Sequence, residues 1–413
     1  MPSKLQGFSI LLALAAVVYQ FLLKDILFRT VGLGRTVLPV SSFPYKCHRI
    51  HGDPNIQACE DMWLDENSRT LYLACSDSAA RRDWMPNIHR LNASARALND
   101  HIVAMEIDNP STSGGYTYRV LETPGFPGVN GDGRIHVVGI TGIHSTDNSD
   151  AQLWLVNDRP SVDSTTGEFL DQEVVGANAT IEVFATKPGA ETMQHVKTYA
   201  NPQIATPNNI AVTKDGGFFF TNDHGPHKVG WRHHLSPVLG TGDVSYCSAT
   251  GNCKKVASGF KFPNGLHLGS DGLLYIPSAA KGDITVLKPA ADGSVTQVHY
   301  IHLDYPIDNL SEDANGDIFA ATMPKGLASL ATFNDPLNAP TAPSTVWRIR
   351  RLNRHLPDEY EYQLDKIIED GAGEKLPGMT TVIHDAKTGT LFMSGELSIL
   401  LYVCPGLVKL TIM

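Results

Sequence analysis

The stretch DMWLDENSRTLYLACSD, residues 61–77, contains the unit from which we expect the fold to be built. An apolar strand is followed by a polar turn and then by a second apolar strand. Across the chain, these turns are rich in Asp, Asn and Gly, which tolerate the positive φ of a tight hairpin. Five more stretches follow this pattern, and they occupy residues 142–158, 208–224, 264–280, 308–324 and 378–396.

One such hairpin cannot bury both of its faces, whereas radial stacking of several copies around an axis can. Six four-stranded sheets around a channel fit six copies and leave only short edges. The alternative is an ordinary β-sandwich, which rarely needs six similar hairpins over such a length. We therefore predict an all-β, six-bladed β-propeller at residues 41–413.

Residues 1–40 have a different pattern. Lys4 precedes a largely apolar run from Phe8 to Leu23. This run is long for a signal-peptide core and short for a full membrane span. We expect a signal sequence or a retained membrane anchor, through which the protein would associate with a membrane or lipid. The alternative is a buried helix of the domain.

The composition limits which binding partners and which cellular compartment we expect for this protein. The 413 residues have a net charge of -10, and no run of Lys and Arg is long enough to suggest nucleic-acid binding. The six cysteines form no CxxC pair, so a zinc site is not expected. The even cysteine count, the apolar leader and the glycosylation sequons at Asn92 and Asn178 favour the secretory pathway. The protein would then be extracellular or anchored on the lumenal side.

The cysteine positions suggest how the ring closes. Cys47 lies before the first repeat and Cys404 after the last, so a bond between them would tie both chain ends into one blade. The remaining four cysteines could pair across hairpins, as Cys59 with Cys75 and Cys247 with Cys253. This connectivity is one of about fifteen for six cysteines, and the spacing leaves the choice open.

Carboxylate and amide residues recur where the repeats begin. The inner strand of each blade would start there and face the channel, so oxygen atoms from several blades would converge. Oxygen donors without thiolate or imidazole form the preferred ligand set of Ca²⁺. Each residue alone is better explained as a turn cap, but capping does not require the same phase in four repeats. The residues are Glu60, Asp61, Asn208, Asn209, Asn264, Asp308 and Asn309.

Several blocks resemble the serum paraoxonase/arylesterase family, in the same order over about residues 45–405. They are EDMWL (60–64), TPNNIAV (206–212), TNDHG (221–225), SGFKFPNGLHLGSDGLLYI (258–276) and YPIDNLSED (305–313). The resemblance implies a six-bladed propeller with two calcium ions in its channel. It also implies hydrolysis of lactones and aryl esters, a retained N-terminal lipid anchor, and a disulfide between the chain ends.

Position by position, the resemblance implies two sets of calcium ligands. The first comprises Glu60, Asn208, Asn264, Asp308 and Asn309. The second comprises Asp61, the carbonyl of Ile143, and Asn209, where the family has Asp. Asn209 removes a negative charge from the second set, so we expect one calcium ion and leave the second in question.

The family's histidines are largely replaced. Thr141 stands where we place one histidine of the family's proton-transfer dyad, and Asp158 or Arg159 stands at the other. A third family histidine is Met323, whereas His224 is retained.

The sequence therefore predicts a calcium-dependent hydrolase of small carboxylic esters or lactones. The candidate catalytic residues are Asp308, Glu60 and His224. Two alternatives remain. One is a non-catalytic propeller that calcium stabilises, and the other is a sugar-lactone hydrolase of the gluconolactonase type.

Overall fold

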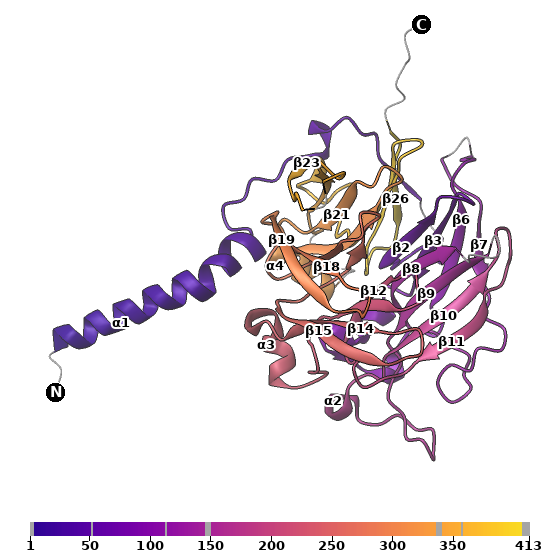
Figure 1. Ribbon diagram of the computed structural model, residues 1–413, viewed down its shortest axis with the longest axis horizontal. Helices are drawn as coiled ribbons and strands as arrows, with labels where there is room; N and C mark the ends of the chain where they lie inside the picture. Colours follow the sequence, from indigo (N-terminus) through magenta and orange to yellow (C-terminus); the bar gives the residue numbers. More distant parts are fainter. Residues whose placement is uncertain are drawn as a thin grey trace, which may run out of the picture.

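The structure is a computed structural model that describes residues 4–50, 53–111, 114–144, 150–335, 341–356 and 358–406. These residues form six four-stranded antiparallel sheets and one small two-stranded sheet (Figure 1). The predicted hairpins supply the two inner strands of each blade, and two further strands complete it outward.

The six sheets follow one another along the chain, and only the last uses a strand from the N-terminal side. The first two are β2 (Asp61–Asp65), β3 (Thr70–Cys75), β6 (His101–Glu106), β7 (Tyr118–Leu121); and β8 (Val137–His144), β9 (Ala151–Asn157), β10 (Thr180–Thr186), β11 (Gln194–Tyr199). The third and fourth are β12 (Pro207–Val212), β13 (Phe218–Asn222), β14 (Gly242–Cys247), β15 (Cys253–Phe260); and β16 (His267–Leu268), β17 (Leu274–Pro277), β18 (Asp283–Pro289), β19 (Val295–His302). The fifth and sixth are β20 (Ile307–Glu312), β21 (Ile318–Thr322), β22 (Ser344–Arg351), β23 (Tyr362–Asp370); and β24 (Thr381–Asp385), β25 (Thr390–Ser394), β26 (Leu401–Cys404), β1 (His48–Ile50).

The innermost strands close a circle. In order, β2, β8, β12, β16, β20 and β24 each contact the next, and β24 contacts β2. Radial stacking buries the faces that one hairpin would leave exposed. Between the first two blades, for example, Tyr72 and Ile102 pack in one apolar cluster with Leu153 and Phe184. The predicted six-bladed propeller is confirmed.

Disulfides reinforce this arrangement. β1 pairs with β26, so the N-terminal side of the domain supplies the outer strand of the last blade. Cys47 and Cys404 form a disulfide beside this pairing. The bond between Cys47 and Cys404 is thus confirmed, and the other two bonds join Cys59 to Cys75 and Cys247 to Cys253, which the spacing leaves open.

Three inner strands share one irregularity. The pairing register shifts between Val137 and Ile140 in β8, between Pro207 and Ile210 in β12, and between Ile307 and Leu310 in β20. Each shift leaves two residues without a regular partner: Val138–Gly139, Asn208–Asn209 and Asp308–Asn309. Such a bulge redirects side chains at the rim of a sheet. In the second blade it lies at Val138–Gly139, ahead of the repeat that we placed at Gly142.

Helices and helical turns precede the first blade or connect strands of the propeller. The longest is α1 (Lys4–Val18), which projects away from the sheets (Figure 1). The others are the π-helical turns η1 (Tyr19–Leu23) and η2 (Ile26–Thr30), α2 (Gln172–Val175), α3 (Trp231–Leu239), α4 (Gly326–Asn334), and the 3₁₀ turns η3 (Val40–Ser42), η4 (Ala80–Arg82), η5 (Pro86–Ile88) and η6 (Ala93–Ala95). The small sheet pairs β4 (Trp84–Met85) with β5 (Arg90–Leu91).

The helix α1 is not buried in the domain. Phe8, Leu11 and Leu14 have exposed fractions of 61%, 67% and 58%, so the buried-helix alternative is wrong. Within the described part of the chain, no helix combines the length and the apolar character that a bilayer crossing requires.

Candidate active site

The start of each inner strand brings polar side chains to the channel. All seven carboxylate and amide residues that the sequence singled out are buried, with exposed fractions of 5% or less. The first blade supplies Glu60 and Asp61, and the third, fourth and fifth blades supply the others. The last blade adds two hydroxyl groups that the sequence analysis missed, on Thr380 and Thr381.

One group of these residues forms an oxygen-lined cage. Asn309 Nδ2 donates to Glu60 Oε1 at 2.8 Å, and the Asn264 side chain hydrogen bonds to Asp308. The backbone oxygen of Glu60 is held by Thr380 Oγ1 at 3.0 Å. These contacts bring residues from four blades to one place.

The cage contains unpaired acceptors. Glu60 Oε2, Asn208 Oδ1 and Asn264 Oδ1 are buried and have no hydrogen-bond partner. Leaving such atoms unpaired costs about 1–3 kcal/mol each, so buried acceptors normally have a partner. Three oxygen acceptors from three blades fit a hard cation such as Ca²⁺. The described residues contain no group of three or more His, Cys, Asp or Glu side chains suited to a metal, and this cage has only two carboxylates.

The electrostatics of the cage also favour a cation. Burial raises the pKa of Glu60 well above its usual value, and the charges of Asp61 and Asp308 raise it further. Burial likewise raises the pKa of Asp308, with added contributions from Glu396 and Asp61. Several carboxylates are thus gathered in a buried space, where like charges destabilise one another unless a proton or a cation is present.

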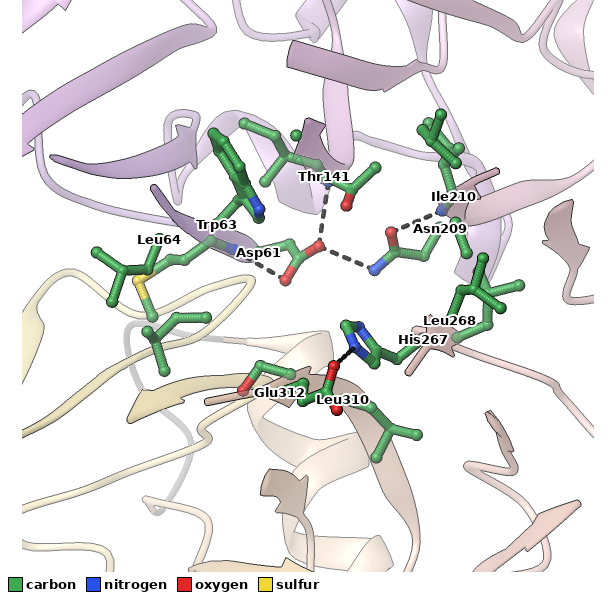
Figure 2. A pocket seen from close by; sticks show the side chains of 18 of the residues that line it. Asp61, Trp63, Leu64, Thr141, Asn209, Ile210, His267, Leu268, Leu310 and Glu312 are labelled. Atoms are coloured by element: carbon green, nitrogen blue, oxygen red, sulfur yellow. Dashed lines mark hydrogen bonds and ion pairs between the residues drawn. The ribbon is translucent and has the colours of Figure 1, made fainter. Parts of the chain in front are cut away.

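Asp61 and Asn209 lie at a different level of the channel. They line a cavity of about 200 Å³ together with Thr141, Ile143 and His267 (Figure 2). Asn209 Nδ2 donates to Asp61 Oδ2 at 2.8 Å. The backbone atom of the second blade that contacts Asp61 is the nitrogen of Ile140, at 3.1 Å, whereas Ile143 pairs further along the strand with Gln152.

His224 is enclosed by backbone carbonyls. Its Nδ1 lies 3.0 Å from the oxygen of His233 and its Nε2 lies 2.8 Å from the oxygen of Asn87. Its ring also stacks on that of His233, with 3.6 Å between centroids. Burial lowers the pKa of His224 to about 4. Both carbonyl acceptors favour the protonated ring, but burial outweighs them, so His224 is a weak base near neutral pH.

The sequence analysis missed two carboxylates near the cage, Asp223 and Glu396. Asp223 accepts from Asn87 Nδ2 at 2.6 Å, and burial raises its pKa to about 7. Glu396 forms an ion pair with Arg81 at 3.3 Å. Asp223 directly follows β13, and Glu396 follows β25. Since the strands of a hairpin are antiparallel, the end of the second strand lies beside the start of the first, and that position could have identified both residues.

An apolar cavity of about 460 Å³ lies over the same end of the channel. His224 and Met323, which follow the second strands of their blades, form part of its wall. Ile26, Thr30 and Val31 of the N-terminal segment contribute to another part of it. This segment is held to the propeller by Arg29, which pairs with Asp283 at 3.4 Å. The remaining wall comes largely from α3 and α4.

The predicted glycosylation sites have accessible positions. Asn92 and Asn178 are both exposed. Asn309 also begins a formal sequon, Asn-Leu-Ser, but its exposed fraction is only 1%. An enzyme that glycosylates the folded chain could therefore reach the first two asparagines and not the third.

The fold and the site together define a six-bladed β-propeller with a buried, oxygen-lined channel beneath an apolar cavity. Residues 172–363 match the family model described as Arylesterase, and the predicted resemblance to the paraoxonase/arylesterase family is confirmed. The matched range includes Asn208, Asn264 and Asp308, but it does not extend to Glu60.

The curated relatives show the same resemblance. Serum paraoxonase/arylesterase 1 of Mus musculus is 30% identical over 181 residues, which cover 43% of this chain and 49% of the relative. Serum paraoxonase/arylesterase 2 of Homo sapiens is 30% identical over 183 residues, which cover 43% of this chain and 50% of the relative. The chain thus spans about half the length of the curated relatives it matches.

Solved structures with a similar fold are more distant in sequence. A gluconolactonase from Xanthomonas campestris is 16% identical, with a TM-score of 0.46 and coverage of 90% of this chain and 99% of that one. A luciferin-regenerating enzyme is 13% identical, with a TM-score of 0.49 and coverage of 88% and 96%. At these values the structures carry no argument about the chemistry of this chain.

Proposed function

We propose that this protein is a calcium-dependent hydrolase of carboxylic esters and lactones. The observation that carries the proposal is the set of buried, unpaired oxygens on Glu60, Asn208 and Asn264. With Asp308 and Asn309, these residues would hold one calcium ion. The family match over residues 172–363 supports hydrolysis as the activity.

Bound calcium would supply a Lewis acid that polarises the substrate carbonyl and stabilises the developing oxyanion. The residues of the chain have separate tasks. The apolar cavity would bind the lipophilic part of the substrate and exclude water. Asp308, fixed by the Asn264 side chain, is our candidate for accepting the proton of the attacking water. Glu60 would mainly hold the cage, since Asn309 already donates to its other oxygen.

Substitution of Asp308 tests this proposal. Asp308→Asn keeps an oxygen ligand but cannot accept a proton as a carboxylate does, whereas Asp308→Ala loses both properties. We expect Asp308→Asn to lower the turnover of phenyl acetate and of lactones by about 100-fold or more, because general-base catalysis contributes on this scale. Asp308→Ala should in addition weaken calcium binding, measured by titration calorimetry.

Asp365→Asn is a matched control, because Asp365 lies on β23 and pairs with Arg348 at 2.7 Å. Its turnover and calcium affinity should equal those of the unmodified protein. Removal of calcium with a chelator should lower both the melting temperature and the turnover. Unchanged turnover in Asp308→Asn would contradict the role of Asp308.

A second candidate function is a propeller that binds calcium for stability alone. It is favoured by the burial of His224, which lowers the pKa of this histidine to about 4 and leaves it a weak base. In that case calcium removal would lower the melting temperature, while no substrate in a panel of aryl esters, lipophilic lactones and sugar lactones would be turned over.

We also propose that the protein resides in the secretory pathway or outside the cell. Its three disulfides support this location, because such bonds persist in oxidising compartments. The exposed α1 would then provide contact with a lipid surface, through side chains such as Phe8 and Leu11.

A further inference from the structure

We propose that the site between Asp61 and Asn209 takes no cation, and that the Asn209 amide group provides the cross-link that a second cation would otherwise make. The inference concerns the channel of the proposed function, but it does not require that the chain hydrolyse anything. It rests on the hydrogen bonds around Asp61, which differ in kind from those of the oxygen-lined cage.

The carboxylate of Asp61 is already saturated with donors. Oδ1 accepts from the backbone nitrogen of Met62 at 2.8 Å and from Thr381 Oγ1 at 3.1 Å. Oδ2 accepts from the backbone nitrogen of Ile140 at 3.1 Å and from Asn209 Nδ2 at 2.8 Å. A carboxylate offers about four lone-pair positions, and each of them is used. A cation would have to displace donors whose hydrogens already point at these oxygens.

The orientation of the Asn209 side chain is fixed by its partners. Its Oδ1 accepts from the backbone nitrogen of Ile210 at 2.7 Å, and a backbone nitrogen can only donate. Nδ2 must therefore face Asp61, as Figure 2 shows. If the amide were rotated by half a turn, Nδ2 would face the backbone N–H of Ile210 and Oδ1 would face Asp61 Oδ2. A donor would then meet a donor, and an acceptor would meet an acceptor. The only side-chain oxygen of Asn209 is thus turned away from Asp61 and is not available to a shared ion.

The oxygen-lined cage differs from this site because it contains unpaired acceptors. There, Glu60 Oε2, Asn208 Oδ1 and Asn264 Oδ1 are buried without partners, which is the arrangement that a bound ion completes. Among the described residues, the side-chain oxygens of Asp61 and Asn209 are not in this unpaired group. The second blade also presents a backbone N–H to Asp61 rather than a carbonyl, and an N–H repels a cation.

The same hydrogen bonds explain how the chain keeps its blades together here without a metal. Asn209 Nδ2 also lies 3.1 Å from Asn309 Oδ1, so one amide group links the first, third and fifth blades. Ile140 adds the second blade and Thr381 adds the last. A cation in this position would link the blades by coordinating oxygen atoms from several of them. The hydrogen bonds of the Asn209 amide and its neighbours link the same blades with neutral donors.

The variant Asn209→Asp tests the inference. It would place a second carboxylate within hydrogen-bond distance of Asp61, and two buried carboxylates at that separation need a proton or a cation between them. We expect purified Asn209→Asp to bind one more calcium ion per chain than the unmodified protein at about neutral pH. The count would be measured by equilibrium dialysis against calcium followed by mass spectrometry of the metal.

Asp61→Asn and the double variant Asp61→Asn with Asn209→Asp complete the design. Each has at most one carboxylate at this position, so each should bind the same number of ions as the unmodified protein. A gain of one ion in Asn209→Asp supports the inference whatever the starting count. If the starting count is zero, the calcium cage of the proposed function fails while this inference stands.

Two results would overturn the inference. One is an unchanged ion count in folded Asn209→Asp, and the other is the loss of one ion in Asp61→Asn. The second comparison remains decisive even if Asn209→Asp does not fold. Circular dichroism of each variant would establish that its propeller is intact before the ions are counted.

Discussion

At the scale of single residues, Asp158 stands out because its carboxyl group is buried beside another acid. Its exposed fraction is 4%, and burial raises its pKa well above the ordinary value of 3.8. The charge of Asp223 raises this pKa further and that of Glu396 does so slightly, while Lys228 and Arg81 lower it. Asp158 is one of the two residues, with Arg159, that the sequence analysis offers for the position of a family histidine.

The raised pKa of Asp158 has a consequence for stability. The folded protein keeps a proton that the unfolded chain loses, so the free energy of unfolding falls as pH rises from the unfolded pKa through the folded pKa. Asp158→Asn is uncharged at every pH and should abolish this contribution. We expect the variant to melt at a higher temperature than the unmodified protein at about pH 8 and to show a smaller decline between about pH 5 and pH 8. Thermal unfolding at fixed saturating calcium measures both, and parallel pH profiles would contradict the prediction.

At the scale of elements, the bulges in β8, β12 and β20 determine which side chains reach the channel. In β12 and β20 the bulged residues are polar pairs. Each pair stands at the start of its repeat, so its position can be found in the sequence. In β8 they are Val138 and Gly139, which carry no polar signal. The repeat is therefore placed at Gly142, within the strand, and the resemblance implies the carbonyl of Ile143 as a ligand of the second calcium ion. The backbone atom of this blade that contacts Asp61 is the nitrogen of Ile140.

The hairpins themselves were predictable because alternation and turn residues are local properties. The positions of Asp223 and Glu396 depend instead on which strand end lies beside the channel, and this is known only once the sheets are assembled. The apolar cavity is less predictable still, since it combines η2, α3 and α4, which are far apart in the sequence. Hairpin patterns thus define the scaffold, while the surroundings of the site depend on long-range packing.

The fourth blade shows how one small residue supports the cage. Gly265 follows Asn264, and a Cβ atom on it would lie 1.8 Å from Asn309 Oδ1 and 2.6 Å from Asn309 Cα. Because a backbone atom is involved, the clash cannot be relieved by a side-chain rotation alone. Gly265 is therefore needed so that the fourth and fifth blades approach closely.

We expect Gly265→Ala to displace Asn309 and to weaken calcium binding by about 10-fold or more, as changes that misorient metal ligands commonly do. Titration calorimetry would measure the affinity. Gly115→Ala is the control, since a Cβ there meets its nearest neighbour at 3.4 Å, and Gly115 lies in the connection between β6 and β7, the outermost strand of the first blade. Equal affinities for the two variants would show that the close approach at Gly265 is not required.

At the scale of the whole molecule, the ring is held closed by the last blade, where β1 from one end of the domain pairs with β26 from the other. Among the described residues this pairing comprises three residue pairs, His48–Val403, Arg49–Tyr402 and Ile50–Leu401. If it opened, the first and last blades could separate and the channel would lose its common axis. The disulfide between Cys47 and Cys404 makes this closure covalent across a sequence separation of 357 residues.

The size of that loop leads to a prediction about the two terminal cysteines. In the chain-entropy description, a bond closing so large a loop stabilises the fold by roughly 6 kcal/mol, whereas the bond between Cys247 and Cys253, with a separation of 6 residues, contributes about 2 kcal/mol. We expect the paired substitutions Cys47→Ser and Cys404→Ser to lower the free energy of unfolding, measured with urea, by clearly more than Cys247→Ser with Cys253→Ser. The calcium cage should also become easier to empty in the first variant, since opening of the ring separates the blades that carry its oxygens. Equal losses of stability in the two variants would mean that strand pairing and blade packing, and not the disulfide, keep the ring closed.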